Sequence, residues 1–158
     1  MKSTKRFGFT LVELMVVVAM LGIIVAVTTP RVIRVRERSD LRAARDEIAT
    51  ALAMARSAAV QKGITANFIL RNDSVQVRLS NDQVILPVRA LFELYDAKVE
   101  MTLDGAAKAT DTLTFDSRGF GMRTSTGATK YTVRIGSITS DVCVSRLGLV
   151  TKVGCVSQ

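Results

Sequence analysis

The residue best suited to chemistry is Glu13, the only charged side chain in an apolar run of 21 residues from Phe9 to Thr29. A carboxylate within such a run costs roughly 2.5–3.5 kcal/mol at mid-bilayer depth and less toward the interface. An ammonium group offsets that cost, because opposite charges attract strongly in a low dielectric. The sequence therefore predicts that Glu13 has a partner.

Other residues are poorly arranged for catalysis. The chain has no His and only two Cys, which excludes His-based triads and His/Cys zinc sites. Asp116, Ser117 and Arg118 form the densest polar cluster, but no nucleophile has a base beside it and no Gly-rich phosphate loop follows a strand. A salt-bridged turn at a strand end explains this cluster. We expect no catalytic residue, no metal site and no cofactor.

The element that carries Glu13 is predicted to be a transmembrane helix over residues 9–29. At ~1.5 Å per residue, a helix of this length reaches across a ~30 Å hydrocarbon core. The leader before it carries Lys2, Lys5 and Arg6 and no acidic residue, so we expect a cytoplasmic N-terminus and an outward-facing remainder.

The segment from Gly8 to Leu14, GFTLVEL, resembles the class III signal of type IV pilins and type II secretion pseudopilins. The resemblance implies that a prepilin peptidase removes leader residues 1–8 by cutting between Gly8 and Phe9, and that Phe9 is then N-methylated. It also implies that Glu13 pairs with the Phe9 amine of a neighbouring subunit. An ordinary signal peptide would have a shorter apolar region, and a plain membrane anchor would explain neither Glu13 nor the Gly8–Phe9 junction.

Residues 30–62 are predicted to continue the helix as an amphipathic stem. Pro30 predicts a kink, and Gly63 predicts the end of the helix. Apolar residues recur at spacings of three and four, which predicts a stripe that packs on the following domain. The members of this stripe are Leu41, Ala44, Ile48, Leu52, Ala55 and Ala59.

A basic stripe runs along the same stem, and its residues lie within about a quarter-turn of one another around the helix. Its members are Arg31, Arg34, Arg38, Arg42 and Arg45. Such a face can contact phospholipid head groups or acidic residues of the next subunit. The alternative is a solvated face, partly neutralised by the pairs Arg36–Asp40 and Arg42–Asp46.

The rest of the chain, residues 64–158, changes to a period of two and predicts a β-rich head. Strands are expected at 64–71, 75–79, 84–88, 99–103, 112–115, 131–135, 141–145 and 149–153, with residues 91–98 open between a short helix and a loop. The expected fold class is α+β. A long N-terminal helix, with a transmembrane half and an amphipathic half, packs on one small head of short antiparallel strands.

Two head segments narrow the resemblance. Leu113 to Gly121, LTFDSRGFG, and Cys143 to Val150, CVSRLGLV, resemble the GspH/FimT-like branch of minor pilins and pseudopilins. This implies a minor pilin of a type IV pilus that acts in the initiation or tip complex, with other major and minor pilins and an inner-membrane assembly platform as partners. The resemblance also implies a single-pass inner-membrane protein with a periplasmic head, later incorporated into a filament. A minor pseudopilin of a type II secretion system shares these motifs and is the alternative.

The net charge does not by itself indicate that the protein binds nucleic acid. The chain carries +8 at pH 7, but residues 64–158 hold 11 basic and 9 acidic residues. Some FimT-like relatives take up DNA through arginines that follow a Gly near the C-terminus, whereas residues 148–152 here read GLVTK. A DNA receptor for transformation, binding double-stranded DNA, is the second alternative. The candidate DNA or lipid contacts are Arg31, Arg34, Arg38, Arg146 and Lys152.

The two cysteines, Cys143 and Cys155, are both expected outside the membrane, where the compartment favours oxidation. We predict a disulfide between them, which contributes ~2–3 kcal/mol in the loop-entropy model. Two buried free thiols are the alternative.

Overall fold

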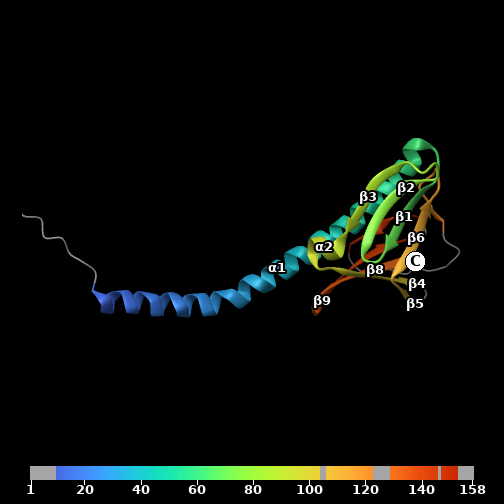
Figure 1. Ribbon diagram of the computed structural model, residues 1–158. Helices are drawn as coiled ribbons and strands as arrows, with labels where there is room; N and C mark the ends of the chain where they lie inside the picture. Colours follow the sequence, from blue (N-terminus) through green and yellow to red (C-terminus); the bar gives the residue numbers. More distant parts are fainter. Residues whose placement is uncertain (1–9, 104–105, 123–128, 146, 153–158) are drawn as a thin grey trace, which may run out of the picture. The chain divides into compact units, whose positions relative to one another are not determined.

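The computed structural model describes residues 10–103, 106–122, 129–145 and 147–152, and the side chains of residues 27 and 29–31 lie outside the described set. The chain divides into two compact units, Met1–Arg36 and Glu37–Gln158. Helix α1, Leu11–Lys62, supplies all the described secondary structure of the first unit and continues into the second (Figure 1).

Helix α1 is continuous through Pro30 and ends where the sequence predicts. Its last residue is Lys62, and Gly63 follows in the left-handed region at φ +67°. A glycine adopts this conformation without steric cost, which makes it the usual residue after a helix end.

The predicted apolar stripe of α1 is confirmed, because all six of its members are buried in the core of the second unit. Ala49 and Ala51 are buried as well. Small side chains on this face allow the strands to approach residues 41–59 of the helix closely.

The described residues of the head form two antiparallel sheets of five strands each (Figure 1). The first has the order β3-β2-β1-β6-β7, with the bounds Val84–Ala90, Ser74–Leu79, Ala66–Arg71, Thr110–Phe115 and Gly121–Met122. The second has the order β10-β9-β8-β4-β5, with the bounds Val150–Thr151, Ile138–Val144, Thr129–Ile135, Lys98–Leu103 and Ala106–Lys108. A short helix α2, Leu91–Tyr95, connects β3 of the first sheet to β4 of the second.

The inward faces of both sheets and the buried face of α1 form a single hydrophobic core. Burial alternates along β1, β2 and β8, as expected for strands with one face packed and one solvated. Phe68 of β1 and Tyr131 of β8 make an edge-to-face contact between the two sheets, with ring centroids 5.4 Å apart. The Tyr131 hydroxyl donates a hydrogen bond to Asp111 Oδ2 at 2.7 Å, so its polar end is satisfied.

The expected α+β class is confirmed, and each predicted strand overlaps an observed one. Residues 91–98, for which the sequence did not decide between a short helix and a loop, contain α2 and the first residue of β4. Helix α2 buries Leu91 and is followed by Asp96 in the left-handed conformation. Strands β5 and β7 were not predicted. They have three and two residues, too few to produce a hydrophobic alternation.

Candidate assembly site

The start of α1 is fixed by a hydrogen-bonded cap that places Glu13 in the first turn. Thr10 precedes the helix, and its Oγ1 accepts a hydrogen bond from the Glu13 backbone N–H at 3.2 Å. The Thr10 carbonyl accepts the first helical bond, from Leu14 N–H at 3.2 Å. This is the N-terminal half of a capping box, in which Thr is the cap residue and Glu lies three positions later. The carboxylate of Glu13 makes no hydrogen bond or ion pair with any residue in the described part of the chain.

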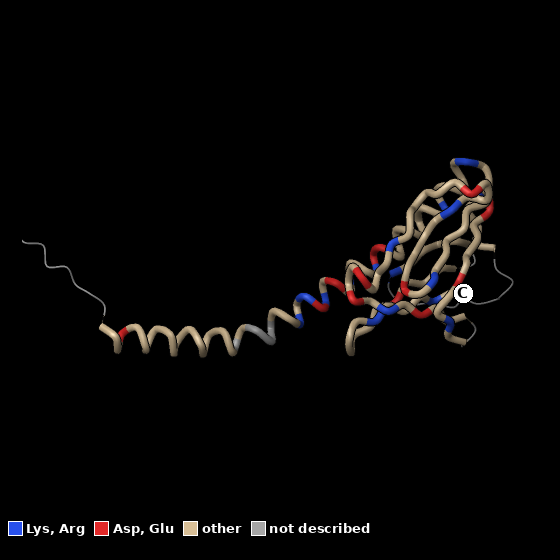
Figure 2. Tube along the Cα trace, viewed as in Figure 1, with Lys and Arg blue, Asp and Glu red and all other residues tan. Residues whose placement is uncertain are grey.

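The first part of α1 is apolar on every side. The described side chains of residues 10–26 are all exposed in the isolated chain, with Leu11 at 74% and Ile23 at 66%. Figure 2 shows this part of the helix almost free of charge, whereas charged residues are frequent further along α1. A helix that is hydrophobic all round needs a membrane or other protein around it. Within the described residues, however, no helical stretch meets the length and hydropathy expected of a membrane span.

Several predicted site residues fall outside the described set. Gly8 and Phe9 precede the first described residue, and the side chains of Pro30 and Arg31 are not described. Cleavage at Gly8, methylation of Phe9 and a kink at Pro30 therefore stay predictions. Of the basic stripe, Arg34, Arg38 and Arg42 are exposed, and Arg45 is half-buried.

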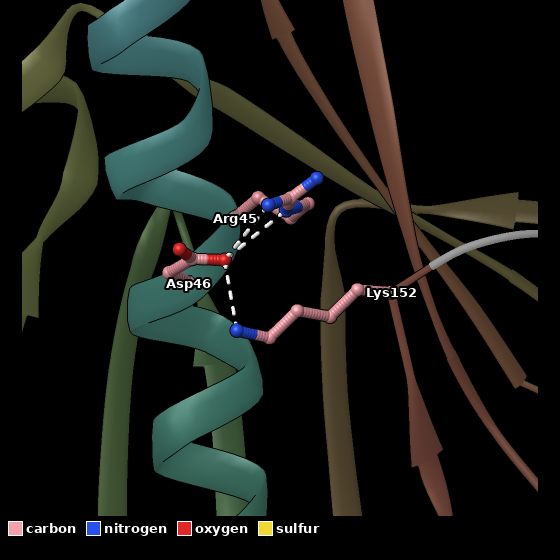
Figure 3. A network of polar contacts seen from close by, with 3 residues as sticks. All are labelled: Arg45, Asp46 and Lys152. Carbon is pink, nitrogen blue, oxygen red and sulfur yellow. Dashed lines mark hydrogen bonds and ion pairs between the residues drawn. The ribbon is translucent and has the colours of Figure 1, made fainter.

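Asp46 links α1 to the end of the second sheet (Figure 3). Its Oδ1 lies 3.0 Å from Lys152 Nζ, just beyond β10, and 3.0 Å from Arg45 Nη2. The hydrogen bond from Lys152, assisted by Arg45, holds the pKa of the Asp46 carboxyl below its ordinary value. The predicted Arg42–Asp46 pair is wrong, because among the described residues Asp46 pairs with Lys152 and Arg45 and not with Arg42.

The next residue of α1 contacts the other sheet. Glu47 Oε1 lies 3.0 Å from Arg89 Nε, near the end of β3. Successive helical residues point about 100° apart, so Asp46 and Glu47 project from different sides of α1. The two adjacent carboxylates therefore hold the helix to both sheets at the same level.

The head segments 113–121 and 143–150, which carry the family resemblance, contact each other at Gly119 and Gly148. Both segments also contact the last turns of α1. A Cβ atom on Gly148 would lie 2.5 Å from the carbonyl oxygen of Gly119, and one on Gly119 would lie 3.1 Å from Val60 Cγ2. Arg56 Nη1 of α1 donates to the Gly148 carbonyl at 3.3 Å. Both glycines have positive φ, so the junction requires glycine for conformation as well as for space.

The polar cluster at residues 116–118 is a hydrogen-bonded turn. Asp116 Oδ1 accepts bonds from the backbone N–H groups of Phe120 at 2.8 Å and Arg118 at 2.9 Å. The bond from Phe120 is the main reason that the pKa of Asp116 lies below its ordinary value. This arrangement gives the aspartate a structural role, as the sequence predicted.

The C-terminal candidates are only partly described. Cys143 lies on β9, is buried and is disulfide-bonded, whereas Cys155 lies outside the described residues. The Cys143–Cys155 pairing stays a prediction. Arg146 also lies outside the described residues, and Lys152 is engaged with Asp46.

Sequence reasoning missed Thr10, Arg56 and the Glu47–Arg89 pair. The pattern Thr10-x-x-Glu13 was a sufficient signal for the cap. The other contacts join residues far apart in the chain, and no local pattern indicates them.

Comparison with known proteins gives a family-model match for the N-terminal segment and a structural match for most of the chain. Residues 3–29 match the family model of the prokaryotic N-terminal methylation motif. The fold is similar to two crystal forms of the type IV minor pilin FimU from Pseudomonas aeruginosa PAO1. One form has a TM-score of 0.57 at 17% identity and covers 75% of this chain and 92% of FimU. The other has a TM-score of 0.54 at 16% identity and covers 73% and 94%. No curated protein matches the sequence significantly.

The chain therefore combines an N-terminal methylation motif with a fold like that of a solved type IV minor pilin, in which a long N-terminal helix packs on a β-rich head. The similarity to FimU is one of fold, at 17% sequence identity or less.

Proposed function

We propose that this protein is a minor pilin subunit of a type IV pilus, with a structural role in the initiation or tip complex and no enzymatic activity. One observation carries the proposal: the chain combines an N-terminal methylation motif at residues 3–29 with the fold of a solved minor pilin.

Assembly would use the N-terminal segment. A prepilin peptidase cuts between Gly8 and Phe9 and methylates Phe9, and the Glu13 carboxylate then pairs with the Phe9 amine of a neighbouring pilin. The cap at Thr10 supports this role, because it satisfies the Glu13 backbone and leaves the carboxylate available for a partner. Burial of the pair among apolar helices makes the attraction strong and selects against an unpaired Glu13.

Before assembly, we propose that residues 9–29 hold the protein in the inner membrane with the head in the periplasm. Support comes from the basic leader and from the exposed apolar side chains of residues 11–26. Extraction into the filament would exchange lipid for the corresponding helices of other major and minor pilins, with an inner-membrane platform driving the exchange.

The test is to shear surface filaments from intact cells and to detect this protein in the sheared and inner-membrane fractions. We expect it in sheared filaments, beside the major pilin. If it is absent from them, and deletion stops protein export while pili persist, the alternative holds and the protein is a minor pseudopilin of a type II secretion system.

Processing provides the first specific prediction. Gly8→Ala should block peptidase cleavage, so that the protein keeps its leader of about eight residues and stays in the membrane fraction. Mass spectrometry of the N-terminus measures this directly. Normal removal of the leader from this variant would contradict the assigned cleavage site.

A further inference from the structure

A groove of about 530 Å³ lies between the last turns of α1 and residues 148–150, within the unit Glu37–Gln158. Its volume is in the range of protein clefts that hold a ligand or a few side chains of a partner. Val60 of α1 and Leu149 are its large apolar lining residues, and they are 50% and 51% exposed. The other helical residues that line it are Ala53, Arg56, Ser57 and Gln61, so we call it the Arg56 groove.

Arg56 is a half-buried cation that the head holds in place in this groove. Its Nη1 donates a hydrogen bond to the Gly148 carbonyl at 3.3 Å. Its side chain also passes close to Gly119, because a Cβ atom on that glycine would lie 3.1 Å from Arg56 Nε and 3.3 Å from its Cγ. These contacts restrict the arginine before any partner binds, so binding to its guanidinium costs little additional side-chain entropy.

The guanidinium of Arg56 has no counterion within the part of the chain that the structure describes. Asp116, in the same turn as Gly119, already pairs with Arg118, whose Nε lies 3.3 Å from Asp116 Oδ2. A guanidinium has five N–H donors, and the bond to Gly148 is the only one that Arg56 makes with described residues. A carboxylate can therefore bind it through two parallel hydrogen bonds.

The surroundings of Arg56 favour a protein partner over nucleic acid. Among the described residues that line the groove, Arg56 is the only charged one. Duplex DNA is bound through several phosphates, by surfaces that are much more positively charged than protein–protein interfaces. A single arginine between Val60 and Leu149 is instead typical of a protein interface, where arginine and apolar side chains form the central contacts.

We propose that the Arg56 groove binds a segment of a different pilin subunit, in which an Asp or Glu is flanked by apolar side chains. The partner carboxylate accepts two hydrogen bonds from the Arg56 guanidinium, and its apolar neighbours pack on Val60 and Leu149. The inference rests on the proposed function and deepens it, because the neighbours of a subunit in an initiation or tip complex are other pilins.

The length of the groove limits the size of the bound segment. From Ala53 to Gln61, α1 rises about 12 Å at 1.5 Å per residue. This length takes about four residues of extended chain or about two turns of a helix. The partner therefore contributes one short segment at this site, and the position of its carboxylate decides whether that segment binds.

The experiment uses the full-length protein in cells that assemble the filaments. The photo-cross-linking residue p-benzoylphenylalanine replaces Val60, and in a second variant Leu149. After irradiation, the membrane and sheared-filament fractions are separated, and mass spectrometry maps the cross-linked peptides. We expect both positions to cross-link to the same segment of another pilin, and we expect that segment to contain an Asp or Glu beside apolar residues.

The charge of Arg56 is then tested in both cross-linking variants. Arg56→Met keeps an aliphatic side chain and removes the charge, so it should lower the yield about fivefold or more. The matched control is Arg118→Met, which removes a cation of the same head whose side chain is 79% exposed and does not line the groove. It should leave the yield within about twofold.

A charge exchange separates loss of the contact from loss of the fold. Arg56→Glu, and replacement of the mapped partner acid by Arg, should each lower the yield, and the two changes together should recover at least half of it. Cross-links confined to this chain, to lipid or to DNA, a mapped segment without an acid, an unchanged yield in Arg56→Met, or no recovery after the exchange would each overturn the inference. The same samples show whether the protein occurs in sheared filaments, which distinguishes a failure of the proposed function from a failure of this inference.

Discussion

At the scale of single residues, Thr10 and Glu13 have separate roles. Thr10 Oγ1 caps the helix through the Glu13 backbone N–H, and substitution of the Glu13 side chain by Ala leaves that N–H in place. Only Glu13 carries the carboxylate that assembly is proposed to use. This role is predicted from residues 8–14, whose lone charge in an apolar run requires a partner and whose resemblance to pilin signals implies which one; it stays a prediction.

We expect Glu13→Ala to abolish incorporation into filaments and to leave membrane insertion intact. Thr10→Ala should cost about 0.5–2 kcal/mol of local helix stability and reduce incorporation far less. Quantitative immunodetection in sheared and membrane fractions measures both. Equal losses in the two variants would mean that the stability of the first helical turn, and not the charge of Glu13, limits incorporation.

The Asp46–Lys152 pair predicts a pH dependence with a definite sign. The folded state lowers the pKa of Asp46, so the charged form is favoured by folding. The resulting stability is fully present above the unfolded-state pKa of about 4 and is lost as pH falls through the lower folded-state pKa. Because both side chains are about half exposed, the contribution is about 1 kcal/mol or less.

Asp46→Asn should therefore lower the free energy of unfolding of the full chain in detergent near pH 7, and the difference from wild type should shrink below about pH 4. Denaturant titrations across this range measure it. In a Lys152→Gln background, the effect of Asp46→Asn should be smaller. If the effect is unchanged there, the Lys152 hydrogen bond is not the cause of the lowered pKa.

At the scale of elements, the Gly119–Gly148 junction joins two segments that the sequence identified without predicting their contact. Gly148→Ala would bring a Cβ within 2.5 Å of the Gly119 carbonyl oxygen, in a conformation with φ +73°. We expect a cost of ~3 kcal/mol or more in the free energy of unfolding, from backbone strain and steric overlap together. Gly136→Ala is the control, because its φ is also positive at +55° but no atom lies within 4 Å. That variant should cost ~1 kcal/mol. Equal costs would show that overlap contributes nothing at Gly148.

Helix α1 shows what the sequence could predict, and the contacts between distant segments show what it could not. The helix, its apolar stripe and its end at Gly63 follow from local periodicity and from one residue type, and all three are confirmed. The pairing of β1 with β6, and the contact of Asp46 with Lys152, join segments separated by dozens of residues. Local patterns carry no information on such contacts, and the incorrect Arg42–Asp46 pair arose because the spacing of four was the only signal available.

At the scale of the whole molecule, two lysines of the head that could bind DNA phosphates are already paired with carboxylates. Lys152 and Lys130 pair with Asp46 and Asp141, at 3.0 and 2.9 Å, so binding a phosphate would require each to give up an internal carboxylate. We expect the full chain in detergent to show no salt-sensitive binding to duplex DNA at low ionic strength, as measured by fluorescence anisotropy. Binding that weakens steeply with salt would support the DNA receptor alternative.

The way the stem is held to the head has a mechanical consequence. Residues 41–59 of α1 pack on both sheets, and Asp46, Glu47 and Arg56 add polar contacts within the same stretch of helix. These contacts follow one another along that stretch, so a force applied along it loads them in shear and is shared among them. Under such a force the head is not peeled from the helix one contact at a time.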